Sequence, residues 1–255
     1  MTNREIFETA VHQSAIDLSA RPEDFLKNEN IIVMSEENNL ARKYLELPFA
    51  CQLVSYGNNI VASVSPVLSD ITKTYINKYP PYHCFETPNL LVFMEKLRPL
   101  GFDICFMAEY WLPDLQILRP LPCSYETRLL TPKDFASLYL PEWSNALCEK
   151  RRHLDMLAIG AYDGDTLIGL AGCSADCGEM WQIGVDVLPA YRKKGIASAL
   201  TSALAAEIVK RGKVPFYCCA WSNVASARNA VKSGFRPAWV EVTAKPIEFI
   251  SEING

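Results

Sequence analysis

The sequence predicts a mixed α/β protein with two parts, and three observations support this. Short apolar stretches that suit strands alternate with stretches that have helical periodicity, most regularly after residue 124. The turn Asp163-Gly164-Asp165 lies between two apolar runs, which is a strong signal for a β-hairpin. Three prolines lie between Leu112 and Ser124 and favour an extended connector. We therefore expect an N-terminal α/β domain over residues 1–120 and a second domain over residues 124–255.

The elements of the second domain begin with a weakly alternating strand at Tyr125–Leu130. Thr131 as N-cap, Pro132 at N1 and Asp134 at N3 predict a helix to about Tyr139. Further along, helical spacing and apolar runs predict the elements that follow. They are a helix at Trp143–His153, strands at Leu157–Tyr162, Thr166–Gly172 and Trp181–Leu188, a helix at Ile196–Lys210, a strand at Pro215–Trp221, a helix at Val224–Lys232 and a strand at Phe235–Thr243.

Composition restricts the classes of protein that fit. The 255 residues are 49% hydrophobic and 21% charged, and the formal net charge is −4. A nucleic-acid-binding protein would show a basic patch or stripe, so we expect no nucleic-acid partner. Residues 1–9 lack an apolar signal-peptide core, and no apolar run approaches the ~20 residues of a membrane span. We therefore expect a cytoplasmic protein with no membrane partner.

The nine cysteines are irregularly spaced, and their number is odd. No CxxC pair occurs, so no metal site is predicted. Reduced and mostly buried thiols of a cytoplasmic protein explain this usage best.

The segment from Val187 to Ser198 carries the clearest chemical signal. A strand ends at Pro189, and a short loop containing Gly195 opens directly into a helix. The first N–H groups of a helix have no intrahelical partner and attract phosphate oxygens, because the helix dipole adds positive charge there. Gly195 has no Cβ and would let the backbone approach a diphosphate. An ordinary strand-to-helix connection would use such a glycine too.

This segment resembles the GNAT superfamily of N-acetyltransferases. Arg192-Lys-Lys-Gly195-Ile-Ala197 fits its Arg/Gln-x-x-Gly-x-Gly/Ala signature, and the order of elements from Tyr125 to Thr243 fits as well. More narrowly, the stretches at 171–176, 180–189 and 215–217 resemble the zwittermicin A resistance branch. The resemblance implies a GNAT-like mixed sheet in the C-terminal half, with acetyl-CoA as cosubstrate.

The resemblance also implies where acetyl-CoA binds. The strands at 185–188 and 216–221 would separate, with the pantetheine arm between them and the diphosphate at the loop. The cofactor-binding residues would be Asp186, Val187, Leu188, Arg192, Lys193, Lys194, Gly195, Ile196, Ala197, Ser198 and Asn223. Asn223 fits equally as the N-cap of the helix that follows it.

Acetyl transfer to an amine needs a base, because an ammonium group of the lysine type has a pKa of about 10.4. Many members of the superfamily carry a tyrosine seven positions after the asparagine, and here that position is Ala230. The catalytic candidates are therefore Asp186, Glu179 and Asn223. Asp186 could be a general base or a structural carboxylate, and strand alternation leaves both roles open.

The N-terminal part has no phosphate-binding loop. Gln52–Tyr56 and Ile60–Ser65 suit strands, and Asn89–Leu100 suits a helix that ends at Gly101, followed by a strand at Phe102–Trp111. This pattern is compatible with a degenerate GNAT-like half or with an unrelated α/β domain, and its role is open.

The resemblance implies an enzyme that acetylates a small amine, such as an antibiotic, as its small-molecule partner. A protein lysine or N-terminal acetyltransferase, and a sensor that binds acyl-CoA without turnover, are the alternatives. Homodimer formation is left open.

Overall fold

The computed structural model describes residues 1–255 and divides them into two compact units. Unit 1 contains residues 1–9 and 111–237, and unit 2 contains residues 10–110 and 238–255. Both units contain helices and strands, so the predicted mixed α/β class is confirmed. Each unit contains two separate segments of the chain. Residues 1–9 belong to the unit that contains residues 111–237, and residues 238–255 belong to the unit that contains residues 10–110.

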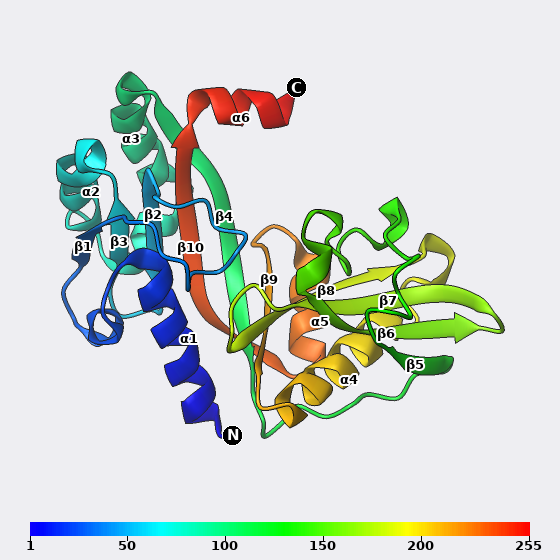
Figure 1. Cartoon of the computed structure of the whole chain (residues 1–255). Helices are drawn as coiled ribbons and strands as arrows, with labels where there is room; N and C mark the ends of the chain where they lie inside the picture. The colour runs from blue at the N-terminus through cyan, green and yellow to red at the C-terminus, as the bar shows by residue number, and fades with distance from the viewer. The chain divides into compact units, whose positions relative to one another are not determined.

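Five strands of unit 1 are ordered β9-β8-β7-β6-β5 (Figure 1). The pairs from β5 to β8 are antiparallel and β8–β9 is parallel, so the sheet is mixed. The predicted hairpin is present, with Gly164 at a φ of +60° between β6 and β7. The strands are β5 (Glu126–Leu130), β6 (Asp155–Asp163), β7 (Thr166–Ser174), β8 (Met180–Val187) and β9 (Val214–Ala220).

The helices α4 (Ile196–Lys210) and α5 (Val224–Lys232) have the bounds that the sequence predicts. The residues at helical spacing on α4 pack on one face of the sheet, where Leu200, Leu204 and Ile208 are fully buried. Gly212 and Gly234, at positive φ, follow the two helices as expected.

The opposite face of this sheet is covered by residues 131–154, which we call the cover segment. Its buried side chains Phe135, Trp143, Ala146 and Leu147 pack on strand residues such as Leu170. Gly172 lies so close to this segment that an added Cβ would be 2.1 Å from the Ala146 carbonyl oxygen. The cover segment therefore rests directly on the strands.

The two helices predicted in the cover segment are wrong. Asp134 Oδ2 accepts hydrogen bonds from the Thr131 backbone N–H at 2.8 Å and from the Thr131 hydroxyl at 2.6 Å, but only a turn follows. Residues 143–153 contain only short 3-10 turns at η5 (Pro141–Trp143) and η6 (Glu149–Leu154). In the second stretch the physical reason is that strand carboxylates bind the backbone N–H groups of residues 145, 146 and 148, so those groups do not build a helix.

Unit 2 contains the strand order β1-β3-β2-β10-β4. The β1–β3 pair is parallel, and β2 pairs antiparallel with both β3 and β10. The predicted elements of the N-terminal part are confirmed as β2, β3, α3 and β4. The strands are β1 (Ile31–Met34), β2 (Cys51–Ser55), β3 (Val61–Val64), β4 (Phe102–Pro113) and β10 (Phe235–Pro246), and the helices are α1 (Asn3–Leu18), α2 (Ser69–Ile76), α3 (Thr87–Leu97) and α6 (Ile247–Asn254).

The core of unit 2 lies between its sheet and the helices α2 and α3. Its fully buried side chains include Leu53, Ile60, Leu68, Ile76 and Leu97. The remaining 3-10 turns of the chain are η1 (Pro22–Leu26), η2 (Pro66–Leu68), η3 (Pro81–Phe85), η4 (Arg98–Leu100) and, in unit 1, η7 (Pro189–Tyr191).

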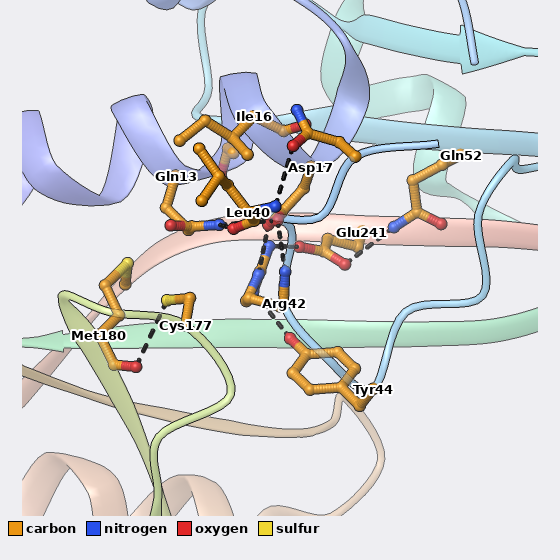
Figure 2. Close-up of polar contacts among 12 residues, drawn as sticks. Gln13, Ile16, Asp17, Leu40, Arg42, Tyr44, Gln52, Cys177, Met180 and Glu241 are labelled. Atoms are coloured by element: carbon orange, nitrogen blue, oxygen red, sulfur yellow. Dashed lines mark hydrogen bonds and ion pairs between the residues drawn. The ribbon is translucent and has the colours of Figure 1, made fainter. Parts of the chain in front are cut away.

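A buried arginine organises the polar interior of unit 2 (Figure 2). The Arg42 side chain is 1% exposed, forms ion pairs with Asp17 and with Glu241, and donates to the Tyr44 hydroxyl at 2.8 Å. Glu241 also accepts a hydrogen bond from Gln52 at 2.8 Å. Because Glu241 lies on β10, this network fixes the C-terminal strand within unit 2.

None of the nine cysteines forms a disulfide, and five are buried: Cys51, Cys84, Cys173, Cys177 and Cys219. No helix combines the length and the apolar character that are needed to cross a membrane.

Candidate functional site

The strands β8 and β9 pair only where they begin. Met180 is paired with Val214, Trp181 with Pro215 and Gln182 with Phe216. From Ile183 onward β8 remains paired with β7 on its other side, as far as Val187, but not with β9. We call the point after Gln182 and Phe216 the fork. Beyond the fork, backbone groups on one edge of β8 can accept an extended ligand such as a pantetheine arm.

The loop at the end of β8 has the geometry of an anion site. Lys193 and Gly195 both adopt left-handed backbone conformations, with φ of +63° and +81°. For Lys193 this conformation is uncommon and costs free energy, which is a feature of functional loops. No side chain caps the N-terminus of α4, and the first internal bond there is Ala199 N–H to Gly195 O at 3.1 Å. The N–H groups of Ile196, Ala197 and Ser198 are therefore available to an anion.

Cationic side chains surround this loop. Lys194 donates to the Tyr125 hydroxyl at 3.3 Å and lies 4.8 Å from the centre of the Tyr191 ring. Arg192 turns back and donates from Nε to the Val187 carbonyl at 3.0 Å, so it holds the loop against the end of β8. These two predicted residues thus make different contacts, and their binding of a cofactor stays a prediction.

Lys232 is a cation of this site that sequence reasoning missed. A Cβ built on Gly195 would lie 3.7 Å from the Lys232 Nζ atom, so the ammonium group lies next to the loop. Lys232 ends α5, a helix that begins 29 positions after Gly195. Its sequence context gives no sign of this role, because a lysine in the last turn of a helix is common for reasons of dipole compensation.

Asp186 holds the cover segment in place. Its Oδ2 atom accepts hydrogen bonds from the backbone N–H groups of Asn145 and Ala146, at 2.9 and 3.0 Å. Its Oδ1 atom accepts a bond from the Asn145 side-chain amide at 2.6 Å. Both oxygens thus bind protein donors, an arrangement that suits an anchor. Its function as a general base stays a prediction.

The other two catalytic candidates have structural partners as well. Glu179, just before β8, forms an ion pair with Lys213 at 3.0 Å, and its side chain is 65% exposed. Asn223 caps α5, with its side-chain oxygen accepting from Ser226 N–H at 3.1 Å. Neither role excludes a contact with a ligand.

Position 230 is a fully buried alanine, and its methyl side chain has no proton to donate, so it offers no acid. A phenol does lie beside α5, from a strand residue that the sequence gave no reason to choose. The Tyr217 hydroxyl is 2.7 Å from Ser226 Oγ. Burial raises the pKa of Tyr217, which keeps its proton in place at neutral pH.

A second carboxylate, Asp155 on β6, also binds the cover segment. It accepts from Cys148 N–H at 2.9 Å and from the Tyr139 hydroxyl at 3.0 Å. Desolvation by burial raises the pKa of Asp155 to about 6. No motif points to this residue, since its role depends on contacts across the fold.

Comparisons with known proteins bear on this site. Residues 123–235 match the model of the acetyltransferase (GNAT) family. No curated protein sequence matches the chain significantly.

Several solved structures are similar to this chain at low identity. One is an acetyltransferase of the GNAT family from Novosphingobium aromaticivorans, with a TM-score of 0.46 and 18% identity, covering 56% of this chain and 66% of that one. The aligned region thus spans slightly less than two thirds of that protein. A GCN5-related N-acetyltransferase-like protein from Streptococcus suis has a TM-score of 0.45 and 19% identity, covering 62% and 69%. A GCN5-related N-acetyltransferase from Sphaerobacter thermophilus has a TM-score of 0.47 and 16% identity, covering 73% and 71%.

The family match lies entirely within unit 1 and includes the fork and the loop before α4. Proteins of this family typically bind acetyl-CoA. The match of residues 123–235 therefore supports the presence of a GNAT acetyltransferase domain in unit 1 of this chain.

Proposed function

We propose that this protein is an acetyl-CoA-dependent N-acetyltransferase that acts on a small amine. The observation that carries the proposal is the combination of the fork with the loop Arg192–Ser198. The fork exposes one edge of β8 from Ile183 to Val187, and the loop directs free N–H groups outward where that strand ends. An extended ligand with a diphosphate at one end fits both features.

In this proposal, backbone groups of Asp186, Val187 and Leu188 bind the pantetheine arm. The N–H groups of residues 195–198 bind the diphosphate, and Lys193, Lys194 and Lys232 add positive charge. Acetyl-CoA would supply the activated acyl group. The fork near Gln182 would then hold the thioester, because it lies on β8 away from the phosphate loop.

The acceptor amine is the finer part of the proposal. The cover segment lies on the same face as Gly184 and Asp186, so residues 143–148 would shape the acceptor site beside the fork. An antibiotic amine, as the resemblance to the zwittermicin A resistance branch implies, is the first acceptor class to test. Protein lysines and N-termini are the alternative acceptors.

Release of CoA thiol from acetyl-CoA, measured with a panel of amines, tests the activity. Stabilisation by acetyl-CoA in thermal unfolding tests binding separately, because a ligand that binds only the native state raises the melting temperature. We expect both signals from the wild-type protein.

Gly195→Trp should remove the stabilisation, since a side chain would block the approach to the N–H groups. Gly212→Trp is the matched control. Gly212 has a similar φ of +72° and open space around it, so it carries the same backbone strain at the other end of α4. A folded Gly195→Trp variant that is stabilised like wild type would contradict the site.

A sensor that binds acyl-CoA without turnover is the second candidate. It is favoured by the buried Ala230 and by the hydrogen bonds that occupy both Asp186 oxygens. Stabilisation by acetyl-CoA without CoA release for any amine would support the sensor.

A further inference from the structure

The side chain of Gln182 bridges the two strands of the fork. Its Nε2 atom donates a hydrogen bond to Cys218 Sγ at 3.0 Å. Gln182 is paired with Phe216, the last residue of β9 that pairs with β8, so Cys218 lies two positions beyond the end of the pairing. The contact therefore crosses diagonally from one strand to the other, over the point where the strands separate.

This contact lies on the face of the sheet that carries the cover segment. Successive side chains of a strand point to opposite faces, so Gln182, Gly184 and Asp186 share one face. Gly184 and Asp186 both lie against Asn145 of the cover segment. Gln182 and Cys218 thus border the proposed acceptor site.

The other face of the sheet at this point is filled by the core of unit 1. Ile183 and Tyr217 directly follow the last pair of residues, are 2% and 4% exposed, and pack in the same hydrophobic cluster as the side chains of α4. Where β8 and β9 are still paired, their backbones are only about 4.8 Å apart, which leaves no space for an acyl chain between them. An acyl group at the fork would therefore turn toward Gln182 and Cys218, which are both half-buried.

The length of the pantetheine arm brings the acyl group to this contact. The arm has about twelve bonds between its phosphate oxygen and the sulfur, as many as four residues of extended chain, and so spans roughly 14 Å. A strand rises about 3.3 Å per residue, so Gln182 lies roughly 16 Å from Val187 along β8. With the diphosphate bound at the loop after β8, the sulfur would lie near Ile183 and the acyl group near Gln182.

We propose that the contact between Gln182 and Cys218 is the end wall of the acyl site and restricts the donor to acyl groups as small as acetyl. This inference rests on the proposed acetyl transfer and adds to it a determinant of donor specificity. A longer acyl chain would have to displace the Gln182 amide and break its hydrogen bond to Cys218. In a closed site, one extra methylene group costs at least about tenfold in specificity.

A comparison of acetyl-CoA with butyryl-CoA tests the end wall. We expect the wild-type protein to bind butyryl-CoA at least about tenfold more weakly in isothermal titration, and to use it with a kcat/KM lower by a similar factor. Gln182→Ala shortens the wall and removes its hydrogen bond to Cys218. This variant should bind the two thioesters with Kd values within about threefold of each other, because the added methylenes then have space.

Three further variants make the test specific. Gln182→Met separates size from hydrogen bonding, because methionine fills a similar space without an amide, and it should retain the preference for acetyl-CoA. Cys218→Ala removes the other half of the wall and should also raise the relative affinity for butyryl-CoA. Gln116→Ala, which shortens an exposed glutamine of unit 1 outside β8 and β9, is the control and should match the wild-type preference. Thermal unfolding without ligand shows which variants are folded.

The outcomes separate the end wall from the proposed function. An unchanged preference for acetyl-CoA in folded Gln182→Ala and Cys218→Ala variants would overturn the end wall alone, and so would equal binding of both thioesters by the wild-type protein. Selective binding of acetyl-CoA without CoA release for any amine would support the wall and contradict acetyl transfer. Absence of binding of either thioester by the wild-type protein would overturn both.

Discussion

Asp186 and Asn145 are joined by two hydrogen bonds, one to the backbone N–H at 2.9 Å and one to the side-chain amide at 2.6 Å. Gly184 makes this contact possible, because a Cβ on it would lie 1.8 Å from the Asn145 carbonyl oxygen. The strand that forms one side of the fork thus also fixes the position of the cover segment. We therefore expect a substitution of Asp186 to displace Asn145 and so to alter the proposed acceptor site.

The anchor and base roles of Asp186 predict opposite results for one pair of variants. Asp186→Asn keeps an oxygen that can accept from Asn145 and Ala146, so an anchor retains kcat within about threefold. Asp186→Ala leaves those N–H groups without their acceptor, which should destabilise unit 1 by about 1–3 kcal/mol and lower kcat as well. Denaturant unfolding and steady-state kinetics check both. A loss of tenfold or more in a stable Asp186→Asn variant would instead identify Asp186 as the base.

Sequence patterns predicted the framework of this site well. The bounds of α4 and α5 follow from apolar spacing and from the glycines after them, which are local signals. The cover segment could not be predicted in the same way. Asp186 and Asp155, on strands that follow it in the sequence, bind the backbone N–H groups of residues 145, 146 and 148, and these bonds compete with the helix predicted from Trp143.

Lys232 should contribute to cofactor affinity through its charge. We expect Lys232→Ala to raise the Kd for acetyl-CoA by about three- to tenfold at low salt, with a smaller effect at high salt because of screening. Isothermal titration at two ionic strengths measures this. Lys210→Ala is the control, since Lys210 pairs with Glu207 at the far end of α4 and should not change the Kd. Equal affinities for the Lys232 variant and wild type at low salt would exclude the contact.

Arg42 should be essential to the stability of unit 2. Arg42→Met removes the countercharge of Asp17 and Glu241, both buried, and leaving such charges unpaired costs about 3–5 kcal/mol. The free energy of unfolding of unit 2, from chemical denaturation, measures the loss. Arg98→Met is the matched control, because the Arg98 side chain is 52% exposed in its pair with Asp103 and should cost less than about 1 kcal/mol. Similar losses for the two variants would show that the buried network adds little.

The pairing partner of the C-terminal strand β10 could not be predicted from the sequence. The apolar pattern predicted a strand from Phe235, but not that residues 240–244 pair with residues 51–55 of β2. Pairing partners depend on complementary surfaces rather than on local propensity. Two of the residues that bind Glu241, Arg42 and Gln52, lie almost 200 positions away in the sequence.

The raised pKa of Asp155 predicts a specific pH dependence of stability. Its pKa rises from an ordinary value of 3.8 to about 6 in the folded protein, chiefly by desolvation. Between these values the folded state binds more protons than the unfolded state, so this group's contribution to stability is complete below about pH 4 and is lost as pH rises through 6.

Asp155→Asn does not titrate and lacks this loss. We therefore expect the free energy of unfolding of the variant, relative to wild type, to increase by on the order of 1–3 kcal/mol between pH 4 and pH 7.5. Urea unfolding of both proteins at the two pH values measures this difference. Asp163→Asn, a hairpin carboxylate outside the buried cluster, serves as the control. A difference between variant and wild type that is independent of pH would show that the pKa of Asp155 is not raised in the folded protein.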